Sequence, residues 1–563
     1  MRDLSIIIPA RNEMFLQETI DDVFKNAKGN IEVIAVLDGY WPEVGIKDDP
    51  RLTLIHHSES VGQRAACNEA AGVSQAKYLM KIDAHCGFDQ GFDIKMMELM
   101  QPDYTMVPVM RNLHAFDWVC PDGHRRYQGP SGVCKECGKE TKMEMVWVGK
   151  TNPQSTAYRF DTDMHFQYWN DWGRKQKGDL TETMSIQGSC FMVTRDKYFE
   201  LDLCSEKDFG SWGQQGVEVA CKTWLSGGRV VVNRKTWYGH MFRTSPGDFG
   251  FPYPNPNRKV VENREKSKEL FARDKWPLAK HKFQWLINKF NPPGWTVNPK
   301  KGIVFYTDNR LRLHIAYRVQ KQLKKISKEM DIPIVSVSLK PMPHFGVRNV
   351  WMGQEHTLLT MVDKNLKETP YKPEPGLLMM SKQILAGLKV IDADIVFLCE
   401  HDVLYHPSHF DFTPLKKDVY YYNTNAWWLR AKDGHCLYFD HRAQSGLCGF
   451  KETLIKYYTE RIRRIEELIA SEKDGMVVAT SGNLIPLKEG IHRLGFEPGT
   501  HNRPEKVDDL PAEDYRSEVP IIDIRHDSNL TQNRWSIKQF RSKPKEWIET
   551  DEIPGWGKGR EIV

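Results

Sequence analysis

The sequence contains no long apolar run, which excludes a conventional membrane-spanning helix. Its 563 residues include no stretch of about 18 consecutive apolar residues, the length such a helix needs. The opening segment Met1–Glu13 has an acidic residue before a short apolar run, so we do not expect a signal peptide. Both observations predict a cytoplasmic protein that does not insert into membranes.

Cysteine and excess charge are also scarce. The 11 cysteines are scattered along the chain, and we interpret most of them as reduced core thiols of a cytosolic protein. The net charge of +5 is only mildly basic and does not by itself indicate nucleic-acid binding. Hydrophobic residues make up 40% and charged residues 27%, which is typical of a soluble globular protein. The length predicts two or three domains.

Apolar strand-like segments alternate with helical patterns at the start of the chain and predict a parallel α/β sheet. The predicted strands are Leu4–Ile8, Ile31–Leu37, Leu52–His56 and Tyr78–Asp83. In open α/β sheets, ligands bind outside the carboxyl ends of the strands. The polar residues expected at that edge are Arg11, Glu13, Asp38, Asp83 and His85.

The tripeptide Asp83-Ala84-His85 is the centre of the predicted site. A carboxylate oxygen and an imidazole nitrogen suit a divalent ion such as Mn²⁺ or Mg²⁺. Such an ion can hold a diphosphate and stabilise it as a leaving group. His240, which follows the predicted strand Arg229–Val232, is a candidate third ligand. A solvated polar strand end and a structural histidine are the alternative interpretations.

Residues 118–141 predict a small zinc-binding insertion. Cys120, His124, Cys134 and Cys137 have the spacing C-x3-H-x9-C-x2-C in a segment that is rich in glycine, proline and charge. Four such ligands suit a closed tetrahedral structural zinc site and leave no open position for catalysis. Incidental thiols are the alternative.

Two glycine-rich segments follow in the same half of the chain. Phe209–Trp224 reads as a turn that opens a helix carrying Glu218. Gly247–Asn257 combines glycine, proline and aromatic residues. It predicts either a mobile lid over a site or a rigid turn.

The strand and helix pattern restarts after a proline-rich linker. We predict a first domain over residues 1–290, a linker over 291–300, a second domain over 301–490 and a C-terminal extension over 491–563 that packs on the second domain. In the second domain, the strands again end in acidic residues, so we infer a diverged copy of the first fold. Its candidate site residues are Asp308, Glu400, Asp402 and His526. An inactive structural copy is the alternative.

These motifs together resemble a family-2-type glycosyltransferase with the GT-A nucleotide-sugar fold, in particular the catalytic domain of polypeptide N-acetylgalactosaminyltransferases. Ser5–Glu13 is similar to the opening strand and loop of that fold. Asp83 and His85 match the D-x-H metal motif, and His240 matches the later histidine of the metal site. The segment after Trp212 matches W-G-G-E-N-x-E near the acceptor, with Gln215 in place of its first glutamate.

The resemblance implies a nucleotide-diphosphate sugar donor, most simply a UDP-sugar, bound with Mn²⁺ or Mg²⁺. The implied nucleotide-binding residues are Pro9, Arg11, Glu13, Asp38, Arg64 and Asp83. The implied catalytic residues are Glu218, Gln215 and Asp83. An inverting mechanism needs a carboxylate to take the acceptor proton, and Glu218 is the candidate. A retaining mechanism needs no dedicated base, and the sequence leaves the two open.

The second half resembles another GT-A-like unit, so the expected fold is two GT-A domains in tandem with a zinc-knuckle-like insertion in the first. The acceptor is open among a hydroxymethylated DNA base, a glycan and a protein. Large anchorless two-domain transferases are similar to enzymes that some bacterial viruses use to glycosylate modified DNA bases, which would place the protein in the host cytoplasm. The alternatives are a bifunctional tandem transferase that builds a two-sugar unit or a polysaccharide, and a non-catalytic nucleic-acid- or glycan-binding protein.

Overall fold

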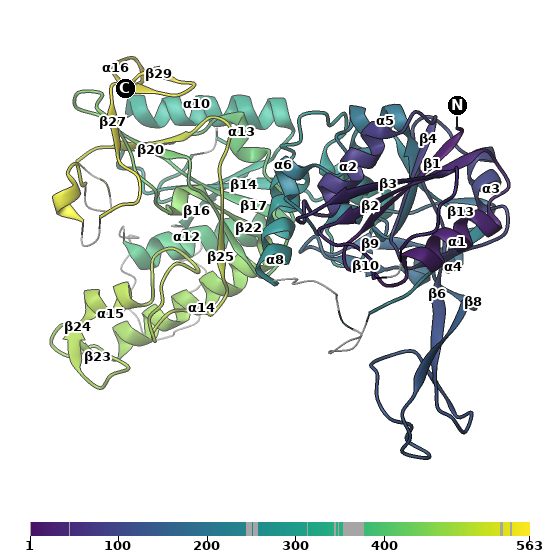
Figure 1. Ribbon diagram of the computed structural model, residues 1–563. Helices are drawn as coiled ribbons and strands as arrows, with labels where there is room; N and C mark the ends of the chain where they lie inside the picture. Colours follow the sequence, from purple (N-terminus) through teal and green to yellow (C-terminus); the bar gives the residue numbers. More distant parts are fainter. Residues whose placement is uncertain are drawn as a thin grey trace. The chain divides into compact units, whose positions relative to one another are not determined.

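The computed structural model of the protein divides the chain into two units, Met1–Val297 and Asn298–Val563. It describes residues 2–43, 45–243, 250, 257–311, 313–342, 345–346, 348–352, 376–527, 529, 533–540 and 543–563. Each unit contains helices and a mixed sheet with a parallel core (Figure 1). The predicted α/β fold class is therefore confirmed. The predicted lid, Gly247–Asn257, lies outside the described residues except for Gly250 and Asn257.

The first unit is built on a sheet whose strands follow the order β11-β13-β6-β12-β4-β1-β2-β3. Its elements are β1 (Leu4–Ala10), α1 (Leu16–Asn26), β2 (Ile31–Asp38), β3 (Leu52–His57), α2 (Gln63–Val73), β4 (Tyr78–Ile82), β5 (Cys86–Phe88), α3 (Phe92–Glu98), β6 (Tyr104–Val119), β7 (Arg125–Tyr127), β8 (Lys142–Ser155), β9 (Tyr158–Phe160), β10 (Phe166–Tyr168), α4 (Asn170–Lys175), β11 (Leu180–Glu182), β12 (Cys190–Thr194), α5 (Arg195–Glu200), α6 (Glu206–Phe209), α7 (Gln215–Leu225), β13 (Arg229–His240), α8 (Asn257–Ser267), the π-helical turn η1 (Lys268–Ala272) and α9 (Phe283–Phe290). The strands β1 to β4 are parallel, so their carboxyl ends meet at one edge.

The core of the first unit explains why these segments become strands and helices. The isoleucines of β1 are fully buried, as continuous apolar runs are in parallel sheets covered on both faces. Helix α1 buries Leu16, Ile20 and Val23, which recur at helical spacing. Strand β13 pairs with β6 and then, through its last residues, with β5. This pairing sets His240 opposite Cys86, next to the loop that follows β4.

Strands β6 and β8 continue beyond the sheet as a long antiparallel hairpin. Strand β7 adds to its end, where Asp117–Val119 pairs with Arg125–Tyr127. The hairpin extends away from the body of the first unit (Figure 1). Residues 118–141 form the end of this hairpin.

The second unit has a seven-stranded sheet with the order β16-β15-β14-β17-β22-β19-β25 and a smaller sheet with the order β18-β26-β20-β21-β27. Its elements are β14 (Lys301–Thr307), α10 (Leu313–Met330), β15 (Ile334–Ser338), β16 (Arg348–Trp351), α12 (Leu377–Val390), β17 (Ile395–Glu400), β18 (Val403–Leu404), α13 (Pro407–Phe410), β19 (Tyr420–Asn423), β20 (Ala426–Arg430), β21 (Cys436–Tyr438), the short helix η3 (Gln444–Gly446), β22 (Leu447–Phe450), α14 (Lys451–Ala470), β23 (Met476–Val478), β24 (Leu484–Pro486), α15 (Leu487–Arg493), β25 (Ala512–Tyr515), β26 (Ile521–Arg525), the short helix η4 (Ile537–Gln539), β27 (Ile548–Thr550), β28 (Glu552–Ile553), β29 (Gly557–Lys558) and α16 (Gly559–Ile562). Residues 491–563 supply β25 and β26, so this segment completes the sheets of the unit rather than adding a layer to it.

Two further expectations concern thiols and membranes. All eleven cysteines are free thiols. No helix in the described part of the chain has the length and apolar composition that crossing a bilayer requires.

Candidate active site

Three side chains predicted to bind a metal converge at the carboxyl edge of the first sheet. Asp83 and His85 lie in the turn between β4 and β5, and His240 ends β13. The Nε2 atom of His240 lies 3.2 Å from Asp83 Oδ2 and 3.2 Å from His85 Nε2. One ligand atom from each residue lies within 4.8 Å of the other two. Sequence positions 155 residues apart thus meet at one point.

Glu13 orients His85 from the side away from this point. Its Oε2 atom lies 2.9 Å from His85 Nδ1, and both of its oxygens accept hydrogen bonds of 2.7 Å from Arg243. Burial raises the pKa of Glu13, but His85 and Arg243 outweigh it and leave the pKa below its ordinary value. A carboxylate at Nδ1 favours the proton there, which leaves the Nε2 lone pair directed at Asp83 and His240.

The charges around Asp83 and His240 favour a bound cation. Burial raises the pKa of Asp83, but Lys81 and the two histidines lower it by more. The net pKa is below the ordinary value, so the carboxylate is ionised. Burial lowers the pKa of His240 to about 4, so its imidazole is neutral at physiological pH. An ionised carboxylate and neutral imidazoles are the forms that bind metals. The three residues therefore fit a divalent cation of the Mn²⁺ or Mg²⁺ type.

A cavity of about 480 Å³ opens beside these three residues. The loop after β1, the loop before α2 and the first turn of α7 contribute to its wall. The predicted site residues that line it are Pro9, Arg11, Glu13, Asp38, Asp83, His85, Gln215 and His240. Its volume falls within the range of pockets that hold small ligands and cofactors.

Asp38 lines the cavity, but its carboxylate is engaged in ordering a loop. It accepts hydrogen bonds from the Ser60 hydroxyl at 2.8 Å and from the backbone amides of Val61 and Gly62 at 2.6 and 3.2 Å. Gly62 has a φ of +96°, and a Cβ there would lie 2.5 Å from the Cβ of Ser211. Asp38 and a glycine thus hold the wall of the cavity next to α2.

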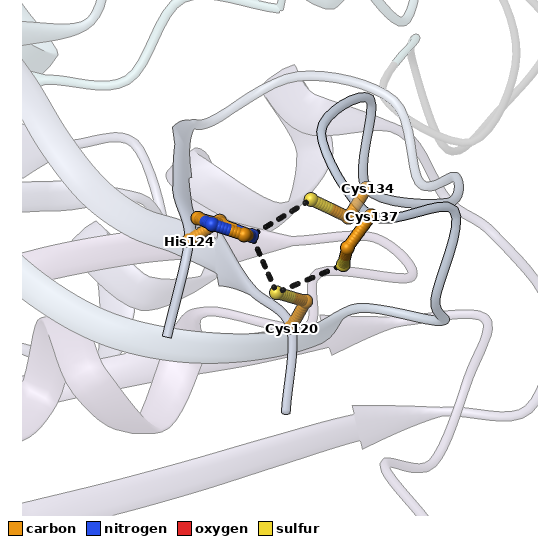
Figure 2. Close-up of side chains that lie close together, drawn as sticks. All are labelled: Cys120, His124, Cys134 and Cys137. Carbon is orange, nitrogen blue, oxygen red and sulfur yellow. Dashed lines mark hydrogen bonds between the residues drawn. The ribbon is translucent and has the colours of Figure 1, made fainter. Parts of the chain in front are cut away.

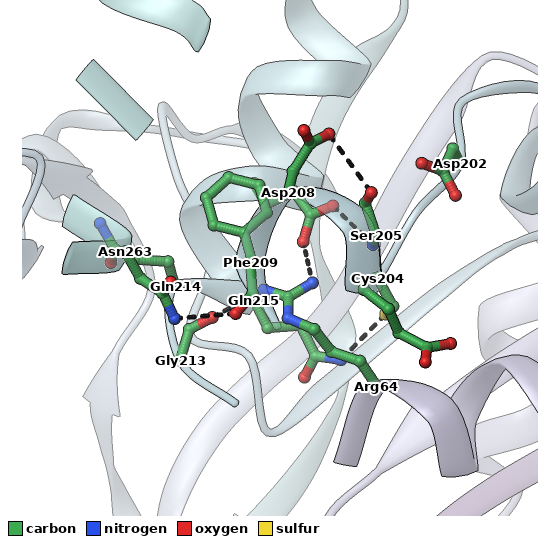
Figure 3. Close-up of polar contacts among 12 residues, drawn as sticks. Arg64, Asp202, Cys204, Ser205, Asp208, Phe209, Gly213, Gln214, Gln215 and Asn263 are labelled. Atoms are coloured by element: carbon green, nitrogen blue, oxygen red, sulfur yellow. Dashed lines mark hydrogen bonds and ion pairs between the residues drawn. The ribbon is translucent and has the colours of Figure 1, made fainter. Parts of the chain in front are cut away.

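Glu218 and Arg64 require a correction, because neither lines the cavity. Both side chains are fully buried and form an ion pair with each other. Glu218 also accepts hydrogen bonds from Lys222 at 2.7 Å and from the Ser205 amide at 2.9 Å. Arg64 donates to the Gly213 carbonyl at 2.6 Å and lies against the Phe209 ring (Figure 3). These residues brace the start of α7, and Glu218 is not placed to take an acceptor proton.

Gln215 does reach the cavity from the first turn of α7. Its side-chain amide donates a hydrogen bond of 2.9 Å to the sulfur of Cys204, which holds the side chain in place (Figure 3).

Two charged residues beside the predicted metal ligands, Lys81 and Arg243, were not singled out from the sequence. Lys81 precedes Asp83 by two residues, and residues two apart in a strand point to the same face, so this spacing was an available signal.

The four predicted zinc ligands also come together at the end of the β6–β8 hairpin (Figure 2). The Nδ1 atom of His124 lies 3.5 Å from Cys120 Sγ and 3.7 Å from Cys134 Sγ. The sulfurs of Cys120 and Cys137 are 3.5 Å apart. Two sulfurs that each lie about 2.3 Å from a tetrahedral zinc are about 3.8 Å apart, so this cluster has the size of a zinc site.

The second unit brings together two of its four predicted residues. Asp402 Oδ2 lies 3.3 Å from His526 Nε2, and His401, which the sequence analysis did not select, joins them. Glu400 accepts a hydrogen bond from Tyr306, and Asp308 pairs with Arg310 at 2.7 Å. Glu400 and Asp308 are therefore neighbours of the cluster rather than members of it.

Comparison with known proteins matches part of the first unit to one family. The family model "Glycosyl transferase family 2" matches residues 5–126. "Putative polypeptide N-acetylgalactosaminyltransferase 13" of Drosophila melanogaster is 23% identical over 47% of this chain and 45% of its own length. Human "Polypeptide N-acetylgalactosaminyltransferase 14" is 23% identical over 39% of this chain and 36% of its own length. The chain thus spans less than half the length of these relatives.

Two solved structures are similar to part of the chain at a low level. The crystal structure of GalNAc-T7 with UDP, GalNAc and Mn²⁺ has 16% identity and a TM-score of 0.37, over 48% of this chain and 49% of that chain. The structure of residues 1–349 of S. aureus TarS has 12% identity and a TM-score of 0.25, over 43% of this chain and 60% of that chain. The match over residues 5–126 and the 23% identity to these relatives confirm the predicted resemblance of the first unit to family-2 glycosyltransferases.

Proposed function

We propose that the first unit is a metal-dependent glycosyltransferase that moves a sugar from a nucleotide-diphosphate sugar, most simply a UDP-sugar, to an acceptor hydroxyl. The observation that carries this proposal is the convergence of Asp83, His85 and His240 beside a cavity of about 480 Å³. The family match over residues 5–126 supports the reaction class.

In this proposal, Asp83, His85 and His240 hold Mn²⁺ or Mg²⁺. When bound there, the ion supplies charge stabilisation to the diphosphate leaving group. Lys81 donates to Asp83 and to the Gly188 carbonyl, and so fixes the carboxylate. Glu13 orients the His85 ring and is itself held by Arg243. These contacts prearrange the site before the donor binds, which reduces reorganisation during the reaction.

The carboxylates of the cavity favour a retaining mechanism. Among the described lining residues, the carboxylates are Glu13, Asp38 and Asp83. Glu13 is bonded to Arg243 and His85, Asp38 to a loop, and Asp83 to Lys81 and His240. An inverting mechanism needs a carboxylate available to the acceptor. Since each of these is already engaged, we propose retention of configuration, with the Gln215 amide beside the acceptor.

A structural zinc ion at Cys120, His124, Cys134 and Cys137 is part of the proposal. The spacing of these ligand atoms supports it, and so does their place at a hairpin end. The purified protein should hold one equivalent of zinc per chain at this site, within the total zinc content measured by inductively coupled plasma mass spectrometry. A Cys134→Ser, Cys137→Ser variant should lose it, and an unchanged zinc content would refute the site.

The donor is tested by incubating the protein with UDP- and GDP-sugars plus Mn²⁺ and measuring the released nucleoside diphosphate. UDP-N-acetylgalactosamine belongs in the panel because the relatives' names specify that sugar. Release that Asp83→Asn abolishes supports the proposal. The matched control is Asp171→Asn, since Asp171 is an exposed carboxylate with a side chain 79% accessible. Metal-independent UDP binding without any release would instead favour a non-catalytic binding protein.

The acceptor remains a proposal among three classes: a hydroxymethylated DNA base, a glycan and a protein. Transfer of a radiolabelled sugar to each class, with the donor identified above, separates them. If DNA is the acceptor, its binding should weaken steeply with salt concentration. A cytoplasmic location stays a prediction from the sequence.

A further inference from the structure

The second unit repeats the strand plan of the first around its own sheet edge. In the first unit, β1 lies between parallel β2 and β4, and β12 is antiparallel to β4. In the second unit, β14 lies between parallel β15 and β17, and β22 is antiparallel to β17. Each unit then adds a parallel segment late in the chain: β13 beside β6 in the first unit, and β25 followed by β26 beside β19 and β20 in the second. The carboxyl end of β17 is therefore the counterpart of the carboxyl end of β4.

The turn after this strand is also built in the same way. In the first unit, the residues after β4 lead into β5, which pairs antiparallel with the end of β13. In the second unit, His401 and Asp402 follow β17 and lead into β18, which pairs antiparallel with β26. His526 follows β26 directly. In both units, potential metal-donor side chains from two elements that are distant in sequence thus lie close together at the carboxyl edge of the sheet.

Three side chains of the second unit form a donor set at this point. One ligand atom from each of His401, Asp402 and His526 lies within 4.8 Å of the others. Asp402 Oδ2 is 3.3 Å from His526 Nε2 and 4.0 Å from His401 Nε2. Donors that each lie about 2.1 Å from a metal are at most about 4.2 Å apart, so both distances from Asp402 match a common ion.

The surroundings of His401 turn its metal-binding nitrogen toward Asp402. Its Nδ1 atom lies 2.6 Å from the Thr307 hydroxyl and 3.8 Å from Asp308 Oδ1. A hydroxyl and a carboxylate on that side favour the proton on Nδ1, which leaves the Nε2 lone pair facing the Asp402 oxygen. Two acceptors then face each other across 4.0 Å. A cation between these two atoms would accept a lone pair from each of them.

The second set is not a copy of the first, residue by residue. The strand register places His240 opposite Cys86, the residue after His85. In the second unit, Asp523 lies opposite Val403, the residue after Asp402. The position of His240 is thus taken by Asp523, and the imidazole comes from His526, three residues later. The site is therefore not predicted by the D-x-H pattern.

We propose that His401, Asp402 and His526 bind a second divalent transition-metal ion, independent of the site at Asp83. Two imidazoles and one carboxylate suit ions such as Mn²⁺, Co²⁺ or Zn²⁺. The site lies where open α/β sheets bind ligands, outside the carboxyl ends of parallel strands. It does not depend on the activity proposed for the first unit.

The test counts Mn²⁺ ions bound per chain, from the electron paramagnetic resonance signal of free Mn²⁺ after equilibrium dialysis. The wild-type chain should bind two ions, Asp83→Asn and Asp402→Asn one each, and the double variant none. An exposed carboxylate of the second unit supplies the matched control, Asp440→Asn, which should still bind two. An Asp402→Asn variant that binds as many ions as the wild-type protein overturns the proposal.

A spectroscopic readout separates a ligand from a residue that only supports the fold. Mn²⁺ bound to the Asp83→Asn variant should show coupling to imidazole nitrogens in electron spin echo measurements. Adding His401→Gln or His526→Gln should weaken or remove this coupling while circular dichroism stays unchanged. These two variants also carry the test if Asp402→Asn does not fold. If the nitrogen coupling is unchanged in both variants, the three residues form a hydrogen-bonded triad that does not bind a metal, and the proposal is wrong.

Discussion

The two sheet edges gather similar donors but brace them differently. In the first unit, Asp83 contacts the buried ammonium of Lys81, and the wall of the site rests on the buried ions Arg64, Glu218 and Lys222. In the second unit, Asp402 accepts a hydrogen bond of 2.8 Å from the Asn529 amide. Its neighbour His401 is held by the Thr307 hydroxyl. The fold fixes where a site lies, whereas the bracing residues set its charge.

This difference predicts how each site fails. Removing one member of a buried ion pair leaves an uncompensated charge, which costs about 3–5 kcal/mol. Removing an uncharged partner from a carboxylate, such as Asn529 from Asp402, costs about 1.5–3 kcal/mol, and removing one partner of a neutral hydrogen bond costs about 0.5–1.5 kcal/mol. We therefore expect substitutions among the braces of the first unit to be more damaging than those of the second.

The largest effect is expected for Glu218→Gln. The change leaves Arg64 and Lys222 buried without their carboxylate, so the first unit should lose about 3–5 kcal/mol of unfolding free energy. Urea unfolding measures the loss. The control is Glu200→Gln at an exposed position, which should change stability by less than about 0.5 kcal/mol. An inactive Glu218→Gln protein with unchanged stability would instead restore the acceptor-base role to Glu218.

A smaller loss is expected for Lys81→Met, which removes the ammonium beside Asp83. The metal-free protein should lose about 1–3 kcal/mol, because a charged group is left without its partner. A bound cation replaces the lost positive charge, so Mn²⁺ should raise the melting temperature of the variant more than that of the wild-type protein. Equal shifts in the two proteins would mean that Lys81 and the metal do not share Asp83.

The second unit contains a buried histidine that makes its stability depend on pH. Burial lowers the pKa of His409 to about 3, and its Nδ1 atom lies 2.9 Å from the Asn423 amide. Below pH 6.5 the unfolded chain binds a proton that the folded unit does not. Stability is therefore full above pH 6.5 and falls as the pH decreases toward 3.

At pH 5, this histidine should cost the second unit about 2 kcal/mol relative to pH 7.5. Urea unfolding at the two pH values measures the cost. A His409→Gln variant has no titrating group there, so its stability should change less between the same pH values. The prediction is wrong if the variant and the wild-type protein show the same dependence on pH.

Local patterns in the sequence were sufficient to predict strands β1 to β4 and to select three side chains that converge beside them. The predicted strand Leu4–Ile8 lies within β1, Leu4–Ala10, because a run of β-branched residues between turns strongly favours a β-strand. Asp83, His85 and His240 met because each follows or ends a strand at the same edge. The cysteine spacing likewise predicted a cluster, since ligands close in sequence need no tertiary information.

Orientation and long-range partners could not be predicted. Glu218 occupies the same position in a helical pattern whether it faces the cavity or the core, and tertiary contacts such as that with Arg64, 154 residues away, decide this. His401 was missed because the second unit reverses the order of its acid and its histidine. The Asp402–His526 contact spans 124 residues, beyond the reach of any periodic pattern.

The smallest effect on stability is expected for Thr307→Val, which keeps the shape of the side chain and removes the hydroxyl beside His401. The bond is neutral, so the second unit should lose about 1 kcal/mol or less. The His401 ring would also lose the contact that orients it, and second-site Mn²⁺ affinity should fall about 10-fold or more. Mn²⁺ titration of the Asp83→Asn background measures this affinity alone.

In the first unit, Glu13→Gln is the matching change at His85, and there the charged Arg243 loses its carboxylate partner. A stability loss for Thr307→Val as large as that for Glu13→Gln would mean that charge does not distinguish the bracing of the two sites.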